Sequence, residues 1–188
     1  MNRNILIVGV GGQGTLLASR ILGRLAINLG FDCKLSEVHG MAQRGGSVVT
    51  HVKMGDKIHS PIIEEGDADI ILAFEKIEGA RYISYLKKDG VLLVSVQEIY
   101  PMPVIVGSQN YPSDILDEIK NKVNVVEMDA LKIADELKNP RTVNVIMLGR
   151  LAKAIGISYD DMEKAVRDTV PEKSMEVNLK ALKRGYEY

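Results

Sequence analysis

The chain has 188 residues, of which 46% are hydrophobic and 26% charged, a composition typical of a globular protein with a substantial core. Its 24 basic and 25 acidic residues leave a net charge of −1, which favours neither a nucleic acid nor an anionic membrane surface as partner. Apolar runs such as ADIILAF are too short to span a bilayer, and the first residues do not resemble a secretory leader. We therefore expect a cytoplasmic protein.

Strand-like and helical patterns alternate over residues 1–128. Strands are expected at residues 4–8, 33–38, 69–74, 91–96 and 122–128. This rhythm predicts an α/β fold with a Rossmann-like, mostly parallel sheet and crossover helices. Residues 45–63 interrupt it with two alternating runs around Gly55 and Asp56, which predict an antiparallel β-ribbon insertion with its turn at these two residues.

The patterns become helical after residue 129. Helices are expected within residues 128–138, 141–156, 158–169 and 173–184, and Ser158-x-x-Asp161 resembles a capping box. Residues 100–112, YPMPVIVGSQNYP, are interpreted as an irregular crossing and not as a domain boundary. We therefore expect a single domain over 1–188, with the sheet in residues 1–128 and a C-terminal helical extension in 129–188.

Cys33 is the single cysteine of the chain. An iron–sulfur cluster is normally held by four thiolates, and structural zinc takes several Cys or His ligands, so we expect this chain alone to bind neither. A redox centre would then belong to a partner. Cys33 itself lies in a strand-like run and is expected to be a small core residue.

A glycine-rich turn follows the first predicted strand. Gly9, Gly11 and Gly14 have the G-x-G-x-x-G spacing of a dinucleotide-binding turn, and Glu37 ends the second predicted strand, where a ribose-binding carboxylate is expected. The same glycines would also serve a tight strand-to-helix turn without a ligand. Thr15 follows Gly14 where a phosphate-binding P-loop requires lysine, so that class is excluded. No Tyr-x-x-x-Lys pair supports a short-chain dehydrogenase.

A second polar, glycine-containing stretch, SEVHGMAQRGGSVVTHVK, spans residues 36–53. It begins at the end of the second predicted strand, where open α/β sheets bind ligands. Its hydrogen-bond donors stand beside glycines, which allow a ligand to approach the backbone closely. The alternative is a structural loop whose polar side chains are only solvated. His51 and His59 lie in the predicted ribbon and are expected to be solvent-exposed structural residues, which leaves His39 as the histidine of interest.

The stretches VGVGGQGTLLASRIL and SEVHGMAQRGGSVVTHVK together resemble the gamma-type subunits of the 2-oxoacid:ferredoxin oxidoreductases, in particular the beta subunits of indolepyruvate:ferredoxin oxidoreductases. The segments SPIIEEGDADIILAFEKIEGAR, YLKKDGVLLVS and NVIMLG match in the order of that family, so the resemblance covers nearly the whole chain. Gln13 inside the turn is one of its specific features.

The resemblance implies a catalytic subunit that is inactive alone. A large alpha subunit would carry thiamine diphosphate and the [4Fe-4S] clusters, in agreement with the single cysteine here. The implied reaction is the oxidative decarboxylation of an aryl-2-oxoacid, with coenzyme A as co-substrate and ferredoxin as electron acceptor. Two alternatives remain open: a stand-alone NAD(P)- or nucleotide-binding Rossmann module, and a non-catalytic scaffold that stabilises its partner.

The candidate substrate-side or coenzyme A-side residues share a position at a predicted strand end or in a glycine-rich loop. They are Gly11, Gly12, Gln13, Gly14, Glu37, His39, Gln43, Arg44, Gly45, Gly46 and Glu75. The turn offers backbone N–H groups to an anion, and the Arg44 guanidinium suits a phosphate or carboxylate. Asn144 interrupts an apolar helical face and is expected to tie that helix to the core through hydrogen bonds.

Overall fold

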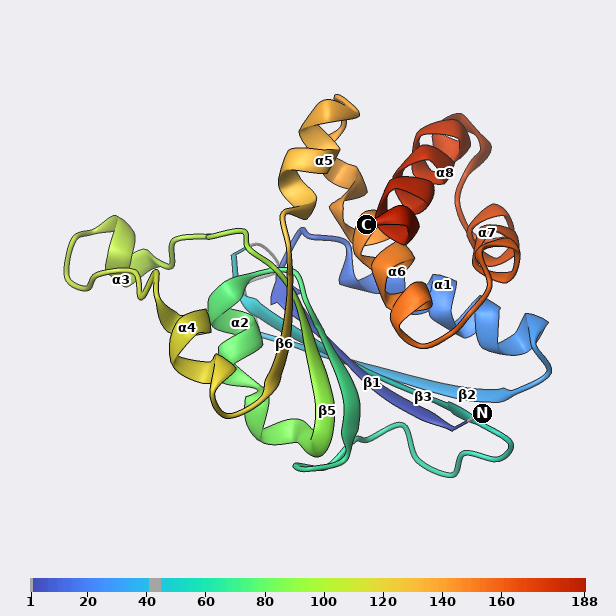
Figure 1. The fold of residues 1–188 in the computed structure, drawn as a ribbon, viewed down its shortest axis with the longest axis horizontal. Coiled ribbons are helices and arrows are strands. Elements are labelled where there is room, and N and C mark those ends of the chain that lie inside the picture. Colours follow the sequence, from blue (N-terminus) through green and yellow to red (C-terminus); the bar gives the residue numbers. More distant parts are fainter. Residues whose placement is uncertain (1, 41–44) are drawn as a thin grey trace.

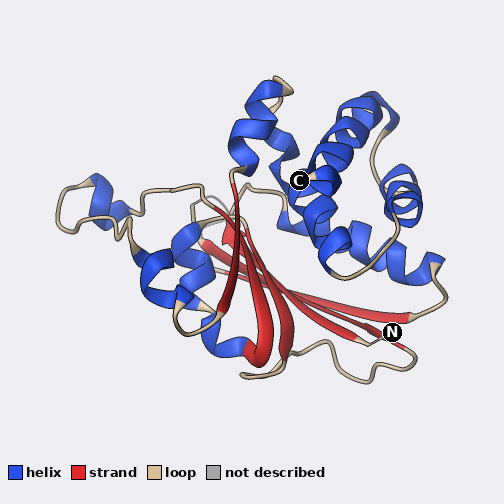
Figure 2. Cartoon of the chain, viewed as in Figure 1, coloured by secondary structure: helices blue, strands red, loops and turns tan. Residues whose placement is uncertain are grey.

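The computed structural model describes residues 2–40 and 45–188 and arranges them in three layers, with helices on both faces of one sheet (Figures 1 and 2). The strands are β1 (Arg3–Val10), β2 (Asp32–His39), β3 (Ser47–Gly55), β4 (Ala68–Ala73), β5 (Leu86–Ser95) and β6 (Asn124–Met128). The helices are α1 (Thr15–Asn28), α2 (Lys76–Arg81), α3 (Met102–Ile105), α4 (Ile115–Lys120), α5 (Ala130–Glu136), α6 (Val143–Ala154), α7 (Tyr159–Arg167) and α8 (Glu172–Glu187), with short 3₁₀ turns at Ile83–Tyr85 and Pro140–Thr142.

The six strands form one sheet in the order β2-β3-β1-β4-β5-β6. Strands β1, β4, β5 and β6 pair in parallel, whereas β3 is antiparallel to both of its neighbours, β1 and β2. The predicted mostly parallel α/β sheet with an antiparallel insertion is therefore confirmed. The inserted strand lies inside the sheet, so β2 is separated from β1.

The turn expected at Gly55 and Asp56 is wrong. Strand β3 ends at Gly55, and its antiparallel partners are β2, which precedes it, and β1; the residues that follow it contain no strand before β4. Because both edges of β3 already pair with a neighbour, no free edge remains for residues 57–63. A local alternation of apolar residues does not reveal that its strand is central.

The two faces of the sheet have separate apolar cores. The central strand β1 is buried on both sides, as expected for a strand covered by helices on each face. Ile5 and Ile7 pack in a cluster with residues of α1 and of α5 to α8, whereas Leu6 and Val8 pack toward α2 and α4 on the opposite face. The helices that follow residue 129 thus form, with α1, the layer that covers one face of the sheet.

Helices α6 and α8 cross at a very short distance because glycines lie at their contact. A Cβ atom added to Gly185 would collide with the carbonyl group of Ile146, and one added to Gly149 with the backbone of Leu182 and Tyr186. No larger residue fits at either position without separation of the helices. This crossing holds α8 on the helical layer of the sheet.

Three local expectations can be compared with the structure. The Ser158 hydroxyl accepts from the Asp161 N–H at 3.1 Å and caps α7, as predicted. Cys33 is half-buried against the core, and burial raises the pKa of its thiol to about 11. His59 is exposed as expected, but the prediction for His51 is wrong, since its ring is buried and its Nδ1 accepts from the Ile63 N–H at 3.1 Å.

None of the helices in the described part of the chain is long and apolar enough to cross a membrane.

Replacement of Gly185 by alanine is expected to destabilise the fold. Alanine has about 1 kcal/mol more helix propensity than glycine, but the added methyl group meets rigid backbone, so the overpacking cost is at the upper end, about 2–3 kcal/mol, and a net loss of about 1–2 kcal/mol is expected. Urea unfolding of the purified chain measures it. Gly40→Ala is the control, because its added methyl group meets no atom of the described residues within 4 Å. Equal stability of the two variants would contradict the tight crossing.

Candidate functional site

The carboxyl ends of the parallel strands meet at one edge of the sheet, where the chain also enters β3. Helix α1, which follows β1, covers one face of the sheet, and α2, which follows β4, covers the other. The β1–β4 boundary is therefore a topological switch point, the place where open α/β sheets bind ligands. The glycine-rich turn lies at this point.

The turn depends on the backbone freedom of glycine. Gly12 and Gly14 have φ angles of 104° and 83°, which side-chain-bearing residues rarely adopt. Gly14 is the N-cap residue of α1, and no side chain of the described residues caps this helix. Within residues 2–40 and 45–188, the N–H groups of its first turn therefore have no side-chain capping partner, and they face the end of the sheet, a favourable environment for an anion.

Gln13 fixes this turn to two neighbouring strands. Its side-chain oxygen accepts from the Val10 N–H at 2.7 Å, and its Nε2 donates to the Phe74 carbonyl at 2.9 Å and to the Gln97 side chain at 3.1 Å. Phe74 follows β4 and Gln97 follows β5. Gln13 is therefore an internal anchor, and its amide has few remaining hydrogen-bonding positions for a ligand.

Asn144 fixes the turn from the opposite side. Its Nδ2 donates to the Gly14 carbonyl at 3.1 Å, and its Oδ1 accepts from the Val145 N–H at 2.9 Å. Its side chain is buried and lies so close to Gly14 that an added Cβ would collide with it. The predicted structural tie is confirmed, and it connects α6 directly to the start of α1.

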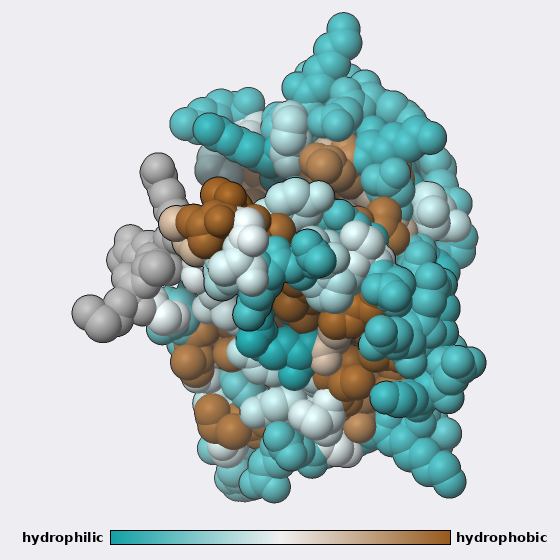
Figure 3. Space-filling view, turned by 90° about the vertical axis from the view of Figure 1, so that its left-hand side faces the viewer, coloured by the Kyte–Doolittle hydropathy of each residue, from teal (hydrophilic) through white to brown (hydrophobic). Residues whose placement is uncertain are grey.

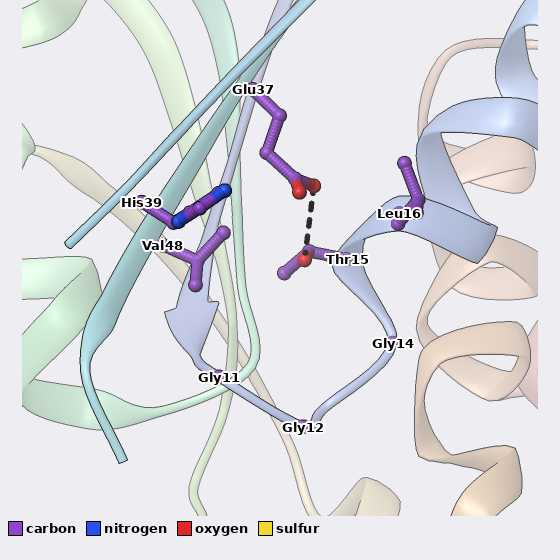
Figure 4. A pocket seen from close by; sticks show the side chains of 8 residues that line it. All are labelled: Gly11, Gly12, Gly14, Thr15, Leu16, Glu37, His39 and Val48. Carbon is purple, nitrogen blue, oxygen red and sulfur yellow. Dashed lines mark hydrogen bonds between the residues drawn. The ribbon is translucent and has the colours of Figure 1, made fainter. Parts of the chain in front are cut away.

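A cavity of about 400 Å³ opens between this turn and strand β2 (Figure 4). Its lining combines turn glycines, the first residues of α1 and residues of β2 and β3: Gly11, Gly12, Gly14, Thr15, Leu16, Glu37, His39 and Val48. Glu37 and His39 lie on the same side of β2 because side chains alternate along a strand. The structure thus brings the predicted turn glycines together with both predicted residues of β2.

The Glu37 carboxylate is oriented by two threonines. Its Oε2 accepts from the Thr50 hydroxyl at 3.1 Å and lies 3.4 Å from the Thr15 hydroxyl. Thr50 is directly opposite Glu37 in the β2–β3 register and is buried. Since β3 separates β2 from β1, Glu37 reaches the turn across an intervening strand. The other carboxylate oxygen, Oε1, has no recorded hydrogen bond within the described part of the chain.

Gly45 and Gly46 are attached to the turn through their backbones. The Gly11 N–H donates to the Gly46 carbonyl at 2.8 Å, and the Gly45 N–H donates to the Gly11 carbonyl at 3.4 Å. The two predicted glycine-rich segments therefore meet in space. Gln43 and Arg44, the other candidates of this loop, lie outside the described residues.

Glu75 lies apart from this cavity and is buried after β4. Its Oε2 accepts from the Glu78 N–H at 2.9 Å and caps α2, while its Oε1 accepts from the Ile99 N–H at 3.3 Å and from the Tyr111 hydroxyl. Burial and the hydrogen bond to Glu75 raise the pKa of Tyr111 well above its usual value, so that phenol remains a donor. The carboxylate is engaged in structural contacts.

Sequence reasoning did not select Thr15, Thr50 or Gln97 for the site. A threonine directly after the last turn glycine was a usable signal, because it begins the helix at the ligand side. Thr50 and Gln97 gave no local signal, since their roles arise from strand pairing and from a contact with the distant Gln13.

Comparison with known proteins agrees with this architecture. Residues 4–188 match the family described as pyruvate ferredoxin/flavodoxin oxidoreductase. The chain belongs to this family. The indolepyruvate oxidoreductase subunits IorB of Pyrococcus horikoshii and Archaeoglobus fulgidus are 42% and 39% identical, over 97% and 99% of this chain and 93% and 94% of theirs. The predicted membership of the 2-oxoacid:ferredoxin oxidoreductases is confirmed, and the comparisons do not support the stand-alone nucleotide-binding alternative.

The fold is likewise that of an oxidoreductase subunit. The crystal structure of the keto/oxoacid ferredoxin oxidoreductase gamma subunit from Geobacter sulfurreducens has a TM-score of 0.73 and 27% identity to this chain. The match covers 98% of this chain and 96% of that one. The helices beyond residue 129 are thus part of the fold of this oxidoreductase family.

Replacement of Gln13 by alanine is expected to lower the stability of the folded protein, because the glycine-rich turn loses its anchor. The variant leaves the Val10 N–H and the Phe74 carbonyl without their partners, and an unpaired buried group costs about 1–3 kcal/mol. The measurement is the midpoint of thermal or urea unfolding. Gln109→Ala provides the control, because the Gln109 side chain is exposed and has no recorded hydrogen bond within the described ranges. A Gln13→Ala variant as stable as this control would show that the anchor is unimportant.

Proposed function

We propose that this chain is the small, IorB-type subunit of an indolepyruvate:ferredoxin oxidoreductase. It would act with a large subunit in the oxidative decarboxylation of arylpyruvates, with coenzyme A as acyl acceptor and ferredoxin as electron acceptor. The 42% identity to an IorB subunit over 97% of the chain carries the proposal. The complete turn, with its anchors Gln13 and Asn144, agrees with retention of a working site.

The cofactors are assigned to the large subunit. A [4Fe-4S] cluster needs four thiolates, and this sequence contains Cys33 alone, so its residues do not fit such a cluster. Within residues 2–40 and 45–188, no group of three or more His, Cys, Asp or Glu side chains is placed to hold a metal ion. We assign thiamine diphosphate to the large subunit as well, and the role of this chain is to complete the site.

The cavity beside the turn is the proposed contact for coenzyme A. Its two ends differ chemically: the N–H groups at the start of α1 suit a phosphate, whereas the Glu37 carboxylate repels phosphate and accepts from a hydroxyl or amino group. Coenzyme A carries phosphates and a ribose hydroxyl on one molecule. His39 at the rim can donate a further hydrogen bond. The sequence-based candidates Gln43 and Arg44 belong to the same proposal.

Reconstitution tests the assignment to the oxidoreductase. We expect the purified chain to be colourless and inactive, and the complex with the large subunit of the same organism to reduce ferredoxin in the presence of indolepyruvate and coenzyme A. Ultraviolet-visible spectra, iron analysis and viologen or ferredoxin reduction are the measurements. Stoichiometric iron in the isolated chain would contradict the cofactor assignment. A large subunit with full activity on its own would contradict the catalytic role of this chain.

Gly12→Ala tests the cavity against a matched control, Gly30→Ala. Both glycines have positive φ, of 104° and 80°, which disfavours alanine at either position, and an added Cβ meets no atom of the described residues within 4 Å at either. Gly12 lines the cavity and Gly30 does not. We expect an at least tenfold increase in the apparent KM for coenzyme A for Gly12→Ala alone.

Equal KM values for the two variants would place coenzyme A elsewhere. Calorimetric titration of the wild-type chain with NADH is the companion measurement, in which we expect no specific binding. Micromolar one-to-one binding of NADH would favour a nucleotide-binding module over the proposed subunit.

A further inference from the structure

Residues 99–112, here called the arm, leave the body of the protein between β5 and α4 and carry α3 at their outer end (Figure 1). Both ends of the arm are fixed on the buried carboxylate of Glu75. The Ile99 N–H and the Tyr111 hydroxyl donate to the same Oε1 atom, at 3.3 and 2.5 Å. The rings of Tyr100 and Tyr111 are 5.2 Å apart and bring the two ends together. The arm therefore projects from the protein with both of its ends fixed by hydrogen bonds and aromatic contact.

The outer part of the arm is apolar and exposed. Tyr100, Met102, Ile105 and Val106 are 53–66% exposed, and residues 99–112 contain no charged side chain in a protein with 26% charged residues. Figure 3, which faces this side of the molecule, shows hydrophobic groups at the surface among hydrophilic ones. A cluster of exposed apolar side chains on a projecting segment is typical of a contact surface.

A groove of about 330 Å³ lies between the arm and the body. Ile77 and Ile99 line it from the body and the root of the arm, and Met102 and Ile105 line it from α3. Gly45 and Gly46, which are joined to the glycine-rich turn by backbone hydrogen bonds, complete its wall. The arm and the groove thus form one surface that is continuous with the proposed coenzyme A site.

The charges around this surface are mainly acidic. Glu98 precedes the arm, and after it Asp114 is the N-cap residue of α4 and Glu118 lies on that helix. Among the described residues the neighbouring cations are paired: Arg81, which lines the groove, with Glu78 at 3.3 Å, Lys76 with Glu98 at 2.7 Å, and Lys120 with Asp117 at 2.7 Å. An acidic rim opposes an anionic membrane or a nucleic acid, both of which attract basic residues. It complements a protein surface with an apolar pocket and a basic rim.

We propose that the arm and its groove dock the large subunit of the oxidoreductase, which receives Met102, Ile105 and Val106 in an apolar pocket bordered by lysine or arginine. This inference rests on the proposed function and names the surface through which the two subunits associate. The fixed root of the arm lowers the entropy cost of binding, because the projecting residues are ordered beforehand. Contact there places the partner beside the glycine-rich turn.

Ile105→Glu tests the docking surface, with Ile27→Glu as its matched control. The two isoleucines are 63% and 61% exposed, and both variants add the same charge, but Ile27 lies on α1 away from the arm. We expect Ile105→Glu to weaken binding of the large subunit at least tenfold in a titration and to lower ferredoxin reduction at limiting subunit concentration. Ile27→Glu should bind as the wild type does, and circular dichroism should show that both variants are folded.

The outcomes separate the two proposals. Wild-type affinity for Ile105→Glu, or an equal loss for both variants, overturns the docking surface but leaves the proposed function intact if the wild-type complex is active. A wild-type chain that neither binds nor activates the large subunit overturns the proposed function itself. Should Ile105→Glu fail to fold, Met102→Ser, which removes an exposed side chain from the same helix, repeats the test with the same expected direction.

Two further measurements distinguish other occupants of the surface. If the wild-type chain sediments with phosphatidylglycerol vesicles and Ile105→Glu does not, the occupant is a membrane and the proposal is overturned. If size-exclusion chromatography shows a wild-type dimer that Ile105→Glu dissociates, the occupant is a second copy of this chain, which also overturns it. We expect no vesicle binding and no effect of the variant on the oligomeric state of the isolated chain.

Discussion

The contact between Asn144 and Gly14 is the constraint on which the site depends. Among the described residues no side chain caps the start of helix α1, which leaves its first N–H groups available to a ligand there, but an uncapped helix start needs support from elsewhere. Asn144 supplies it from α6 by holding the Gly14 carbonyl, and Gln13 supplies it from within the turn by bonding residues at the ends of β1 and β4. Because these contacts use the Gly14 carbonyl and the Gln13 side chain, they do not occupy the N–H groups of the first helical turn.

The inserted strand β3 explains how a Rossmann-like turn and an acidic residue meet in an altered sheet. Strand β2 is one position farther from β1 than direct pairing would place it. Glu37 nevertheless lines the cavity, because Thr50 on β3 and Thr15 on α1 hold its carboxylate over the intervening strand. The same insertion brings Gly46 next to Gly11. The two residues are joined by a backbone hydrogen bond, so the start of β3 lies directly beside the glycine-rich turn.

Glu75 shows how a polar residue at a strand end can serve the structure and not the ligand. It follows β4 at the same edge of the sheet as the turn follows β1, yet its carboxylate is buried and caps α2 while it holds both ends of the arm. The arm owes its position to this carboxylate. One edge of the sheet therefore carries two separate surfaces, a polar cavity beside α1 and an apolar groove beside α3, joined through Gly45 and Gly46.

The sequence by itself determined the elements that depend on neighbouring residues: the strand and helix rhythm, the left-handed glycines of the turn, the Ser158 cap and the family, whose motifs are continuous stretches of chain. Only the tertiary structure decided the central place of β3, the burial of His51 and the capping role of Glu75. All three features depend on which segment, distant in the sequence, packs beside the residue or strand concerned. The period of a sequence reports which faces of an element are apolar, whereas strand order and the partner of a buried polar group are set by contacts between residues far apart in the chain.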